Sequence, residues 1–142
     1  MAGEWTIKDW SADNKANSNF VGYVACDIDV PNSDAITTSV TLPAVAGECI
    51  GVVYDASKLK PDGTVYPNSA VTVKSIGFAR VTANAAITVG AYVNIATVGG
   101  FIAAKAQAGA GAQPGAIVGR ALQAAAALND RPLIFLMIGC RY

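Results

Sequence analysis

The chain of 142 residues is long enough to bury a core without metal ions or disulfides, and its ten acidic and ten basic residues cancel to a formal net charge of zero. Hydrophobic residues make up 53% of it and charged residues 14%, so no basic stripe is present to neutralise phosphates, and we expect no nucleic-acid partner. A surface with so few charges predicts self-association or coverage by a partner.

Membrane and targeting signals are not expected from this sequence. The longest apolar run, 132–139, is shorter than the ~20 residues of a membrane span and fits a buried strand, so no membrane partner is expected. The first ten residues, MAGEWTIKDW, lack the apolar centre of a signal peptide. Three widely spaced cysteines, Cys26, Cys49 and Cys140, predict free thiols in a reducing compartment.

Residues 1–19 differ from the rest of the chain because they are mostly polar. Their large apolar residues are Trp5, Ile7 and Trp10, too few to form a core of their own. We expect an extended N-terminal arm that contributes nothing to the core and anchors these three side chains on a partner protein or a neighbouring subunit. The alternative is a frayed terminus with exposed tryptophans.

From residue 20 to residue 86 the pattern is that of short strands. Apolar and β-branched runs predict strands over 20–30, 36–42, 49–55 and 70–81, with a turn at 61–63. In the first of them, one face is expected to carry Val24, Cys26, Ile28 and Val30, and the opposite face Asp27 and Asp29. In the last, the apolar positions change parity, which predicts a bulge or bend near Lys74–Ser75.

The remaining chain continues with strands and small-residue loops. We expect strands over 87–96, with a turn at Gly90, and over 99–106, 117–122 and 132–139. The alanine-rich stretch 123–128 is too short for an independent helix and predicts a short helical turn. The sequence therefore predicts an all-β fold, a small antiparallel β-barrel or sandwich, with 20–142 as a single β-barrel domain after the arm and less than about one-fifth helix.

No catalytic or metal-binding pattern is present in the sequence. The chain has no histidine and no cysteine pair with zinc spacing, which excludes the common nucleophile systems and zinc sites. The densest acidic cluster, Asp27, Asp29 and Asp34, is typical of the solvated face of a strand, with calcium as the weaker alternative. The glycine-rich stretch 108–116 lacks the lysine of a phosphate-binding loop. We therefore expect no enzyme and no cofactor.

The segment 81–139 resembles the head-decoration, or capsid cement, proteins of tailed bacteriophages. The matching pattern is an Ile-Thr-x-Gly-x-x-Val strand, a hairpin, Gly-x-Ala-Leu-x-Ala-Ala-Ala and a closing apolar strand. The residues that fill it are Ile87, Thr88, Gly90, Val93, Gly119, Ala121, Leu122, Ala124, Ala125 and Ala126. The chain departs from the family at Ala91, where an acidic residue is frequent, and at 129–132, where Gly-Asp or Gly-Glu is common.

The resemblance implies a structural virion protein made in the host cytoplasm and located on the outer capsid surface. It would be a homo-oligomer, a trimer as in that family, which binds the major capsid protein and stabilises the shell by non-covalent cross-bridging. Trp5, Ile7 and Trp10 of the arm would contact the capsid or a neighbouring subunit. Gly90, Gly119, Ala124, Ala125 and Ala126 would be structural turn positions. The alternative is a β-barrel module that recognises carbohydrate or a host-surface ligand through Tyr54, Tyr66 and Phe78.

Overall fold

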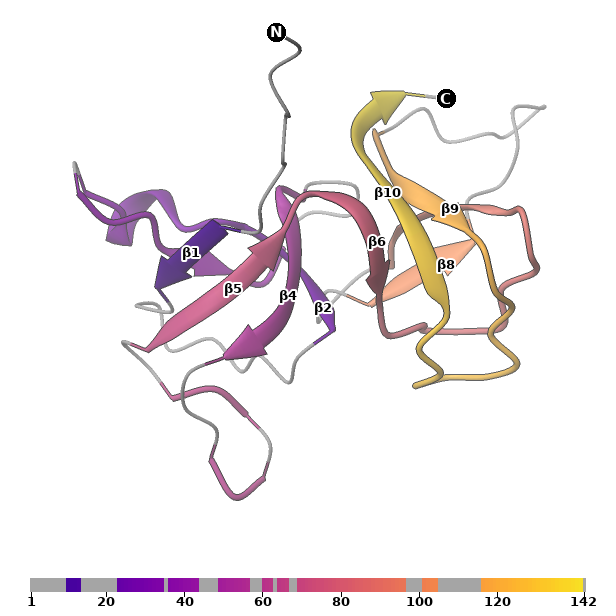
Figure 1. The fold of residues 1–142 in the computed structure, drawn as a ribbon, viewed down its shortest axis with the longest axis horizontal. Coiled ribbons are helices and arrows are strands. Elements are labelled where there is room, and N and C mark those ends of the chain that lie inside the picture. Colours follow the sequence, from indigo (N-terminus) through magenta and orange to yellow (C-terminus); the bar gives the residue numbers. More distant parts are fainter. Residues whose placement is uncertain are drawn as a thin grey trace, which may run out of the picture.

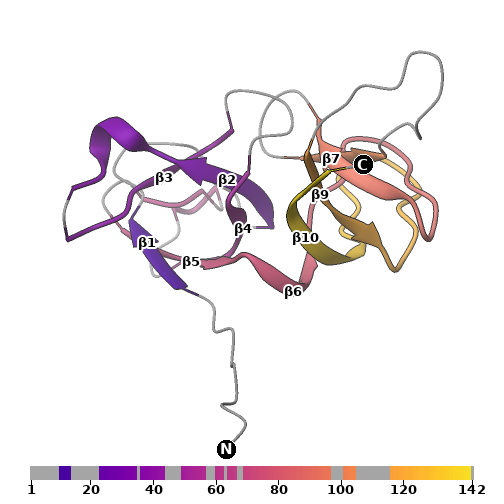
Figure 2. The same cartoon turned by 90° about the horizontal axis from the view of Figure 1, so that it is seen from above.

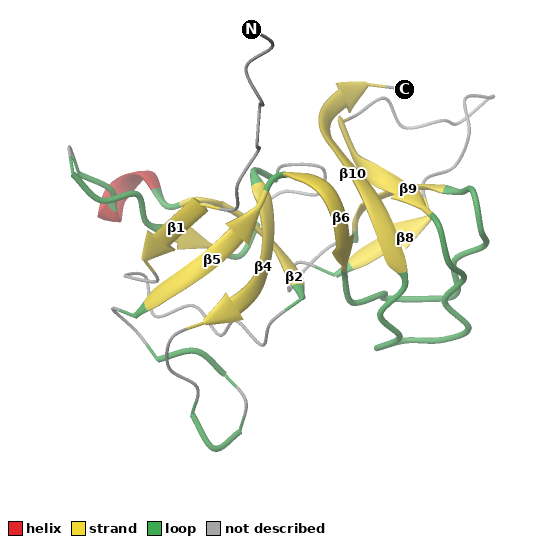
Figure 3. Cartoon of the chain, viewed as in Figure 1, coloured by secondary structure: helices red, strands yellow, loops and turns green. Residues whose placement is uncertain are grey.

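The computed structural model describes residues 10–13, 23–34, 36–43, 49–56, 60–62, 64–66, 69–96, 101–104 and 116–141. Strands dominate these residues, and their one helical element is a single 3-10 turn (Figure 3). The elements in chain order are β1 (Trp10–Asp13), β2 (Val24–Ile28), η1 (Val30–Asn32), β3 (Val40–Thr41), β4 (Gly51–Ala56), β5 (Ala70–Lys74), β6 (Ile76–Arg80), β7 (Tyr92–Ile95), β8 (Ile102–Ala104), β9 (Ala116–Ala121) and β10 (Leu133–Arg141). The prediction of an all-β fold is confirmed.

The strands form two antiparallel sheets that lie side by side (Figures 1 and 2). The first has the order β1-β5-β4-β2-β3 and the second the order β6-β10-β9-β7-β8. We call them, with their loops, the first lobe (residues 10–74) and the second lobe (residues 76–141). The predicted hairpin between 87–96 and 99–106 is present as the pairing of β7 with β8.

The chain passes from one sheet to the other at Ser75. Val71 and Val73 are buried in the first lobe, whereas Ile76 and Phe78, of the opposite parity, are exposed on the second. This change of face confirms the bend predicted near Lys74–Ser75. The Ser75 hydroxyl donates to the carbonyl of Ile50 at 2.8 Å, which holds the switch point against the first sheet.

A shared core joins the two lobes. The first lobe has its own buried cluster, made mainly of valines such as Val24, Val53 and Val73. The other cluster fills the second lobe but also includes Ala25 and Val52 from the first. The prediction of one domain over 20–142 stays a prediction, but packing of this kind favours lobes that move as one body.

The prediction that residues 1–19 lie outside the core is wrong for residues 10–13. They form β1, an edge strand in which Ala12 pairs with Val71 of β5 and is 4% exposed. Composition alone misses such a strand, because its backbone pairing with β5 leaves no signature in the residue types of the segment. The other residues of the predicted arm lie outside the described residues.

The predicted alternation of buried and exposed residues over 20–30 is wrong beyond Ile28. Val24 and Cys26 are buried as the alternation requires, but Val30 is 74% exposed and Asp29 is 6% exposed. The strand stops at Ile28 and the chain turns into η1, so the period-two pattern no longer applies. Asp29 is buried because its carboxylate accepts a hydrogen bond from the Asn32 amide at 2.8 Å.

The helical turn predicted over 123–128 is not present. Ala125 forms an isolated antiparallel bridge with Ile87, with reciprocal N–H to O distances of 2.9 Å. These bonds use the backbone groups that a helix would satisfy internally, so the segment stays extended. Ala125 is 3% exposed while its neighbours face solvent, which explains the need for a small residue there.

Asp130 stabilises the turn that follows this bridge. Its carboxylate accepts hydrogen bonds from the backbone N–H groups of Ala126 at 2.7 Å and Ala127 at 3.1 Å. We expect Asp130→Ala to lower the free energy of unfolding by about 1 kcal/mol, because two donors lose their protein acceptor. Asp130→Asn, which keeps an acceptor oxygen, should lose less than half of that. Urea unfolding measures both, and equal stability of Asp130→Ala and wild type would contradict the role of the carboxylate.

Candidate functional site

One row of side chains crosses four strands of the second sheet. The ladder register places Phe78 of β6 opposite Phe135 of β10, Phe135 opposite Arg120 of β9, and Arg120 opposite Tyr92 of β7. Directly opposed residues in a sheet point to the same face. The four side chains therefore form one continuous row, which we call the aromatic–arginine row.

The opposite face of the same strands forms the core of the second lobe. Ile134 pairs with Ala79 on one side and Ala121 on the other, and all three are at most 6% exposed. Two positions further along β10, on the same buried face, Leu136 lies between Gly77 of β6 and Gly119 of β9. The aromatic–arginine row is thus the outer surface of a packed sheet, which gives its side chains a rigid base.

The β6–β10 end of the row is apolar and open to solvent. Phe78 is 60% exposed, Phe135 38% and the neighbouring Ile76 52%. The two phenylalanine rings are 5.4 Å apart at 49°, so each covers only part of the other. Ile76 is opposite Met137, which extends the apolar surface along the strands. Exposed apolar side chains gathered in this way are typical of an interaction surface.

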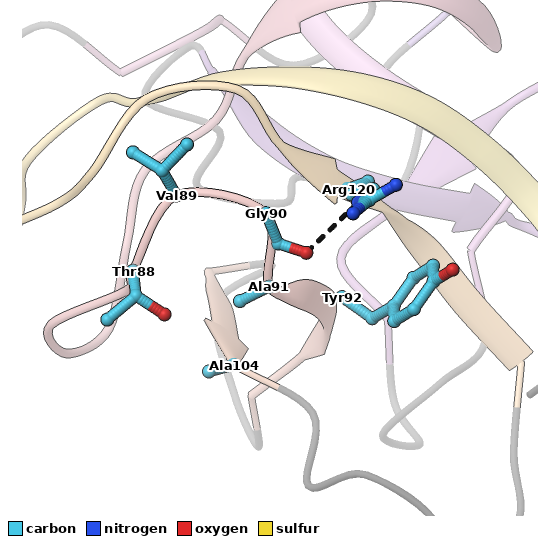
Figure 4. A pocket seen from close by; sticks show the side chains of 7 residues that line it. All are labelled: Thr88, Val89, Gly90, Ala91, Tyr92, Ala104 and Arg120. Atoms are coloured by element: carbon cyan, nitrogen blue, oxygen red, sulfur yellow. Dashed lines mark hydrogen bonds between the residues drawn. The ribbon is translucent and has the colours of Figure 1, made fainter.

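The β9–β7 end of the row is polar and adjoins a pocket. The Arg120 Nε donates to the carbonyl of Gly90 at 3.0 Å, and the guanidinium lies 5.6 Å from the centre of the Tyr92 ring. An open pocket of about 470 Å³ adjoins Arg120, and Figure 4 shows its lining: the turn at 88–91, Tyr92, Ala104 and Arg120 itself. Gly90 has a φ of +82°, a conformation that glycine adopts without strain.

Net charge is divided unequally between the two halves of the chain. Residues 1–75 hold five basic and nine acidic side chains, a net charge of −4, and residues 76–142 hold five basic and one acidic, a net charge of +4. Among the described residues, the polar partners of Arg80, Arg120 and Arg131 are carbonyl oxygens, the Gln123 amide and tyrosine rings, and none is a carboxylate. Within the described part of the second lobe, these three arginines therefore carry positive charge that no neighbouring carboxylate neutralises.

The predicted turn positions have different roles in the structure. Gly90 lies in a turn, as predicted. Gly119 does not: it lies within β9, where an added Cβ would collide with the backbone carbonyl of Phe135. Ala125 forms the buried bridge described above, and Ala124 and Ala126 are exposed on either side of it. The pattern of small residues in this segment thus reflects close approach of strands as much as turns.

The tryptophan anchors of the arm stay a prediction. Trp5 and Ile7 lie outside the described residues, and of Trp10 only the backbone is described, opposite Val73 in β1. The aromatic candidates of the carbohydrate alternative are also divided. Tyr66 lies in the loop between β4 and β5 and Phe78 on β6, while the Tyr54 side chain is outside the described residues.

The acidic cluster is divided among local structural roles. Asp29 accepts from Asn32, and Asp34 accepts from the backbone N–H groups of Ile36 and Thr37. Over the part of the chain that the structure describes, no three His, Cys, Asp or Glu side chains gather as a metal site would require. These carboxylates therefore act in turns.

Cys26 and Cys49 are free, as predicted, and the Cys140 side chain lies outside the described residues. Burial raises the pKa of the Cys26 thiol well above its ordinary value and that of Cys49 to about 12. The Cys49 thiol also donates to the carbonyl of Gly51 at 3.2 Å. Both groups are therefore neutral at physiological pH and have little nucleophilic character.

We expect Ellman's reagent at pH 8 to label Cys26 and Cys49 at least ~100-fold more slowly in the native protein than in denaturant, because the reactive thiolate is disfavoured by burial. Peptide mass spectrometry separates them from Cys140. The same pKa shifts predict that the free energy of unfolding falls as pH rises from 9 towards 12, since only the unfolded Cys49 ionises in that window. Rapid native labelling of Cys49 would contradict the burial.

Sequence reasoning missed Ile76, Phe135, Arg120 and Tyr92 as surface residues. The run 132–139 is continuously apolar, so its exposed and buried positions cannot be separated by period. The usable signal was the parity change after Ser75. It indicates that Ile76 and Phe78 lie on the face opposite that of the buried valines. Because Phe135 of β10 is paired with Phe78 of β6, Phe135 lies on the same exposed face.

No protein-family model matches the chain, and no curated protein sequence matches it. Within the described residues there is no helix of the length and hydropathy needed to cross a membrane.

Proposed function

We propose that the chain is a structural virion protein that binds the outer surface of a phage capsid. It stabilises the shell by non-covalent cross-bridging of major capsid subunits, acts without a cofactor, and works as a homo-oligomer, with a trimer as the expected number. The observation that carries the proposal is the exposed apolar surface around Phe78 and Phe135 on a packed sheet. A partner that covers this surface removes apolar area from water, which is the main driving force of association.

Two further features support the proposal. The segment that resembles capsid cement proteins, 81–139, contains β7, β8, β9 and most of β10 and so supplies most of the sheet that carries the surface. A capsid also repeats its binding sites with symmetry, so that an oligomer engages several at once and modest single contacts give high avidity.

The test uses undecorated empty capsids of the phage that encodes the chain. Purified protein is mixed with them, the capsids are sedimented, and negative-stain images are taken of the pellet. We expect saturable co-sedimentation and regular added density on the outer surface. Protein that stays in the supernatant at micromolar concentration would contradict the proposal.

The carbohydrate-binding alternative is favoured by the same aromatic pair, because exposed rings offer the flat apolar surface on which a sugar face packs. Binding to glycans that is lost in Phe78→Ala, together with no binding to capsids, would favour this function over capsid decoration.

A further inference from the structure

Arg120 is held in place, while most of its donors have no partner among the described residues. A guanidinium has five N–H donors, and Arg120 uses its Nε–H on the carbonyl of Gly90. The Tyr92 ring lies 5.6 Å from the guanidinium carbon. Because these contacts fix the plane of the group, its two terminal nitrogens are presented as a fork, the geometry that pairs with a carboxylate.

The surroundings of Arg120 favour an anion. The residues of the second lobe carry a net charge of +4, and none of the described carboxylates pairs with Arg120. The adjoining pocket of about 470 Å³ is lined by Thr88, by the backbone of the Gly90 turn and by Arg120 itself (Figure 4). As far as the described residues are concerned, a charged side chain from a partner can therefore enter this open pocket.

The strand spacing sets how far apart the two ends of the row begin. Neighbouring strands are about 4.8 Å apart, so the backbone midpoint between Phe78 and Phe135 is about 7 Å from the backbone of Arg120 across the sheet. Side chains at positions i and i+2 of an extended segment point the same way and are separated by nearly the same distance, about 6.6 Å. One extended segment can thus reach both ends.

We propose that the aromatic–arginine row is a docking site for an extended partner segment with an acidic residue followed, two positions later, by a large apolar residue. The carboxylate binds the terminal nitrogens of Arg120 at the mouth of the pocket, and the apolar side chain packs on Phe78 and Phe135. This proposal rests on the proposed function only for the source of the segment, which would be the capsid. Its test needs no capsid.

The test is a titration of isotope-labelled protein with short peptides, followed by NMR at the Arg120 Nε–H signal and at the amides of β9 and β10. The probes are acetyl-Glu-Ala-Leu-amide, its neutral Gln counterpart and acetyl-Glu-Ala-Ser-amide. We expect millimolar binding of the first and at least ~10-fold weaker binding of the other two, because each lacks one of the two contacts. Equal binding of the Glu and Gln peptides would overturn the proposal.

Variants separate the local site from general charge. Arg120→Gln should abolish the preference for Glu over Gln, and Arg120→Lys should restore only part of it, because lysine lacks the fork. Arg131→Gln is the matched control: it removes the same charge from the same lobe, from an exposed arginine 4.6 Å from the Tyr23 ring. It should change peptide affinity less than twofold. If Arg120→Gln and Arg131→Gln lost the same peptide affinity, the net charge of the lobe would account for binding and the proposal would be overturned.

Single-stranded nucleic acid is the other macromolecule that aromatic rings and arginine can bind, and a short oligonucleotide tests for it. A thymidine hexamer should shift the Arg120 signal less than the Glu peptide at the same concentration and salt. Stronger binding of the hexamer, sensitive to Arg120→Gln and to Phe78→Ala, would overturn the peptide assignment. If the peptide results hold and capsids still fail to bind, the proposed function fails and the docking chemistry stands.

Discussion

Phe78→Asp is expected to weaken binding to capsids by about 100-fold while leaving the fold intact. Burial of an aromatic side chain at the centre of an interface often contributes 2 kcal/mol or more, and an aspartate there adds the cost of desolvating a charge. Phe78 is 60% exposed and packs on Phe135 outside the core. We therefore expect its replacement to change the free energy of unfolding by no more than about 1 kcal/mol.

The matched control for this variant is Ile36→Asp. Ile36 is an apolar residue of the first lobe that is 97% exposed, so the same change in charge is made away from the row. Co-sedimentation with capsids over a range of concentrations gives the affinity of each variant, and circular dichroism during heating gives its stability. Equal capsid affinities for Phe78→Asp and Ile36→Asp would show that the row is not the contact surface.

Gly119→Ala is expected to lower the free energy of unfolding by about 3 kcal/mol, at the upper end of the range for overpacked cores. An added Cβ would collide with the backbone carbonyl of Phe135 and lie 2.7 Å from the Ile134 Cγ2 atom. A backbone carbonyl in a ladder cannot rotate away as a side chain can, so β9 and β10 must separate. Because β10 carries Phe135, we also expect weaker binding to capsids.

Gly77→Ala serves as the comparison, because it makes the same substitution in the other strand that flanks β10. Gly77 has a φ of +106° but no atom within 4 Å of the added Cβ, so only backbone strain of about 1–2 kcal/mol is expected. Urea unfolding of the two variants separates collision from strain. A Gly119→Ala protein as stable as wild type would mean that β9 and β10 are not packed as described.

The fold could be predicted from local patterns where a strand has one buried face. The strands at 24–28, 51–56 and 70–74 follow β-branched runs, and the parity change at Ser75 located the bend. Prediction failed where non-local pairing decides the structure. Ala125 is extended because it bonds to Ile87, 38 positions earlier in the chain, and residues 10–13 form a strand because β5 offers a free edge.

The surface was harder to predict than the fold. Glycine and alanine at 119–126 indicated turns, whereas Gly119 allows close contact between two strands. Arg120 and Tyr92 are separated by 28 positions, and only the pairing of β7 with β9 brings them together. Phe135 belongs to an apolar run in which no period distinguishes the exposed positions, so its role could be inferred only after β10 was paired with β6.

The most direct test of the central claim is a cryo-electron microscopy reconstruction of capsids saturated with the protein. The account predicts copies on the outer surface of the shell, with the β6–β10 face of the second lobe against major capsid subunits and Phe78 and Phe135 covered. Bound copies that turn this face towards solvent, or capsids that carry no added density at saturation, would contradict it.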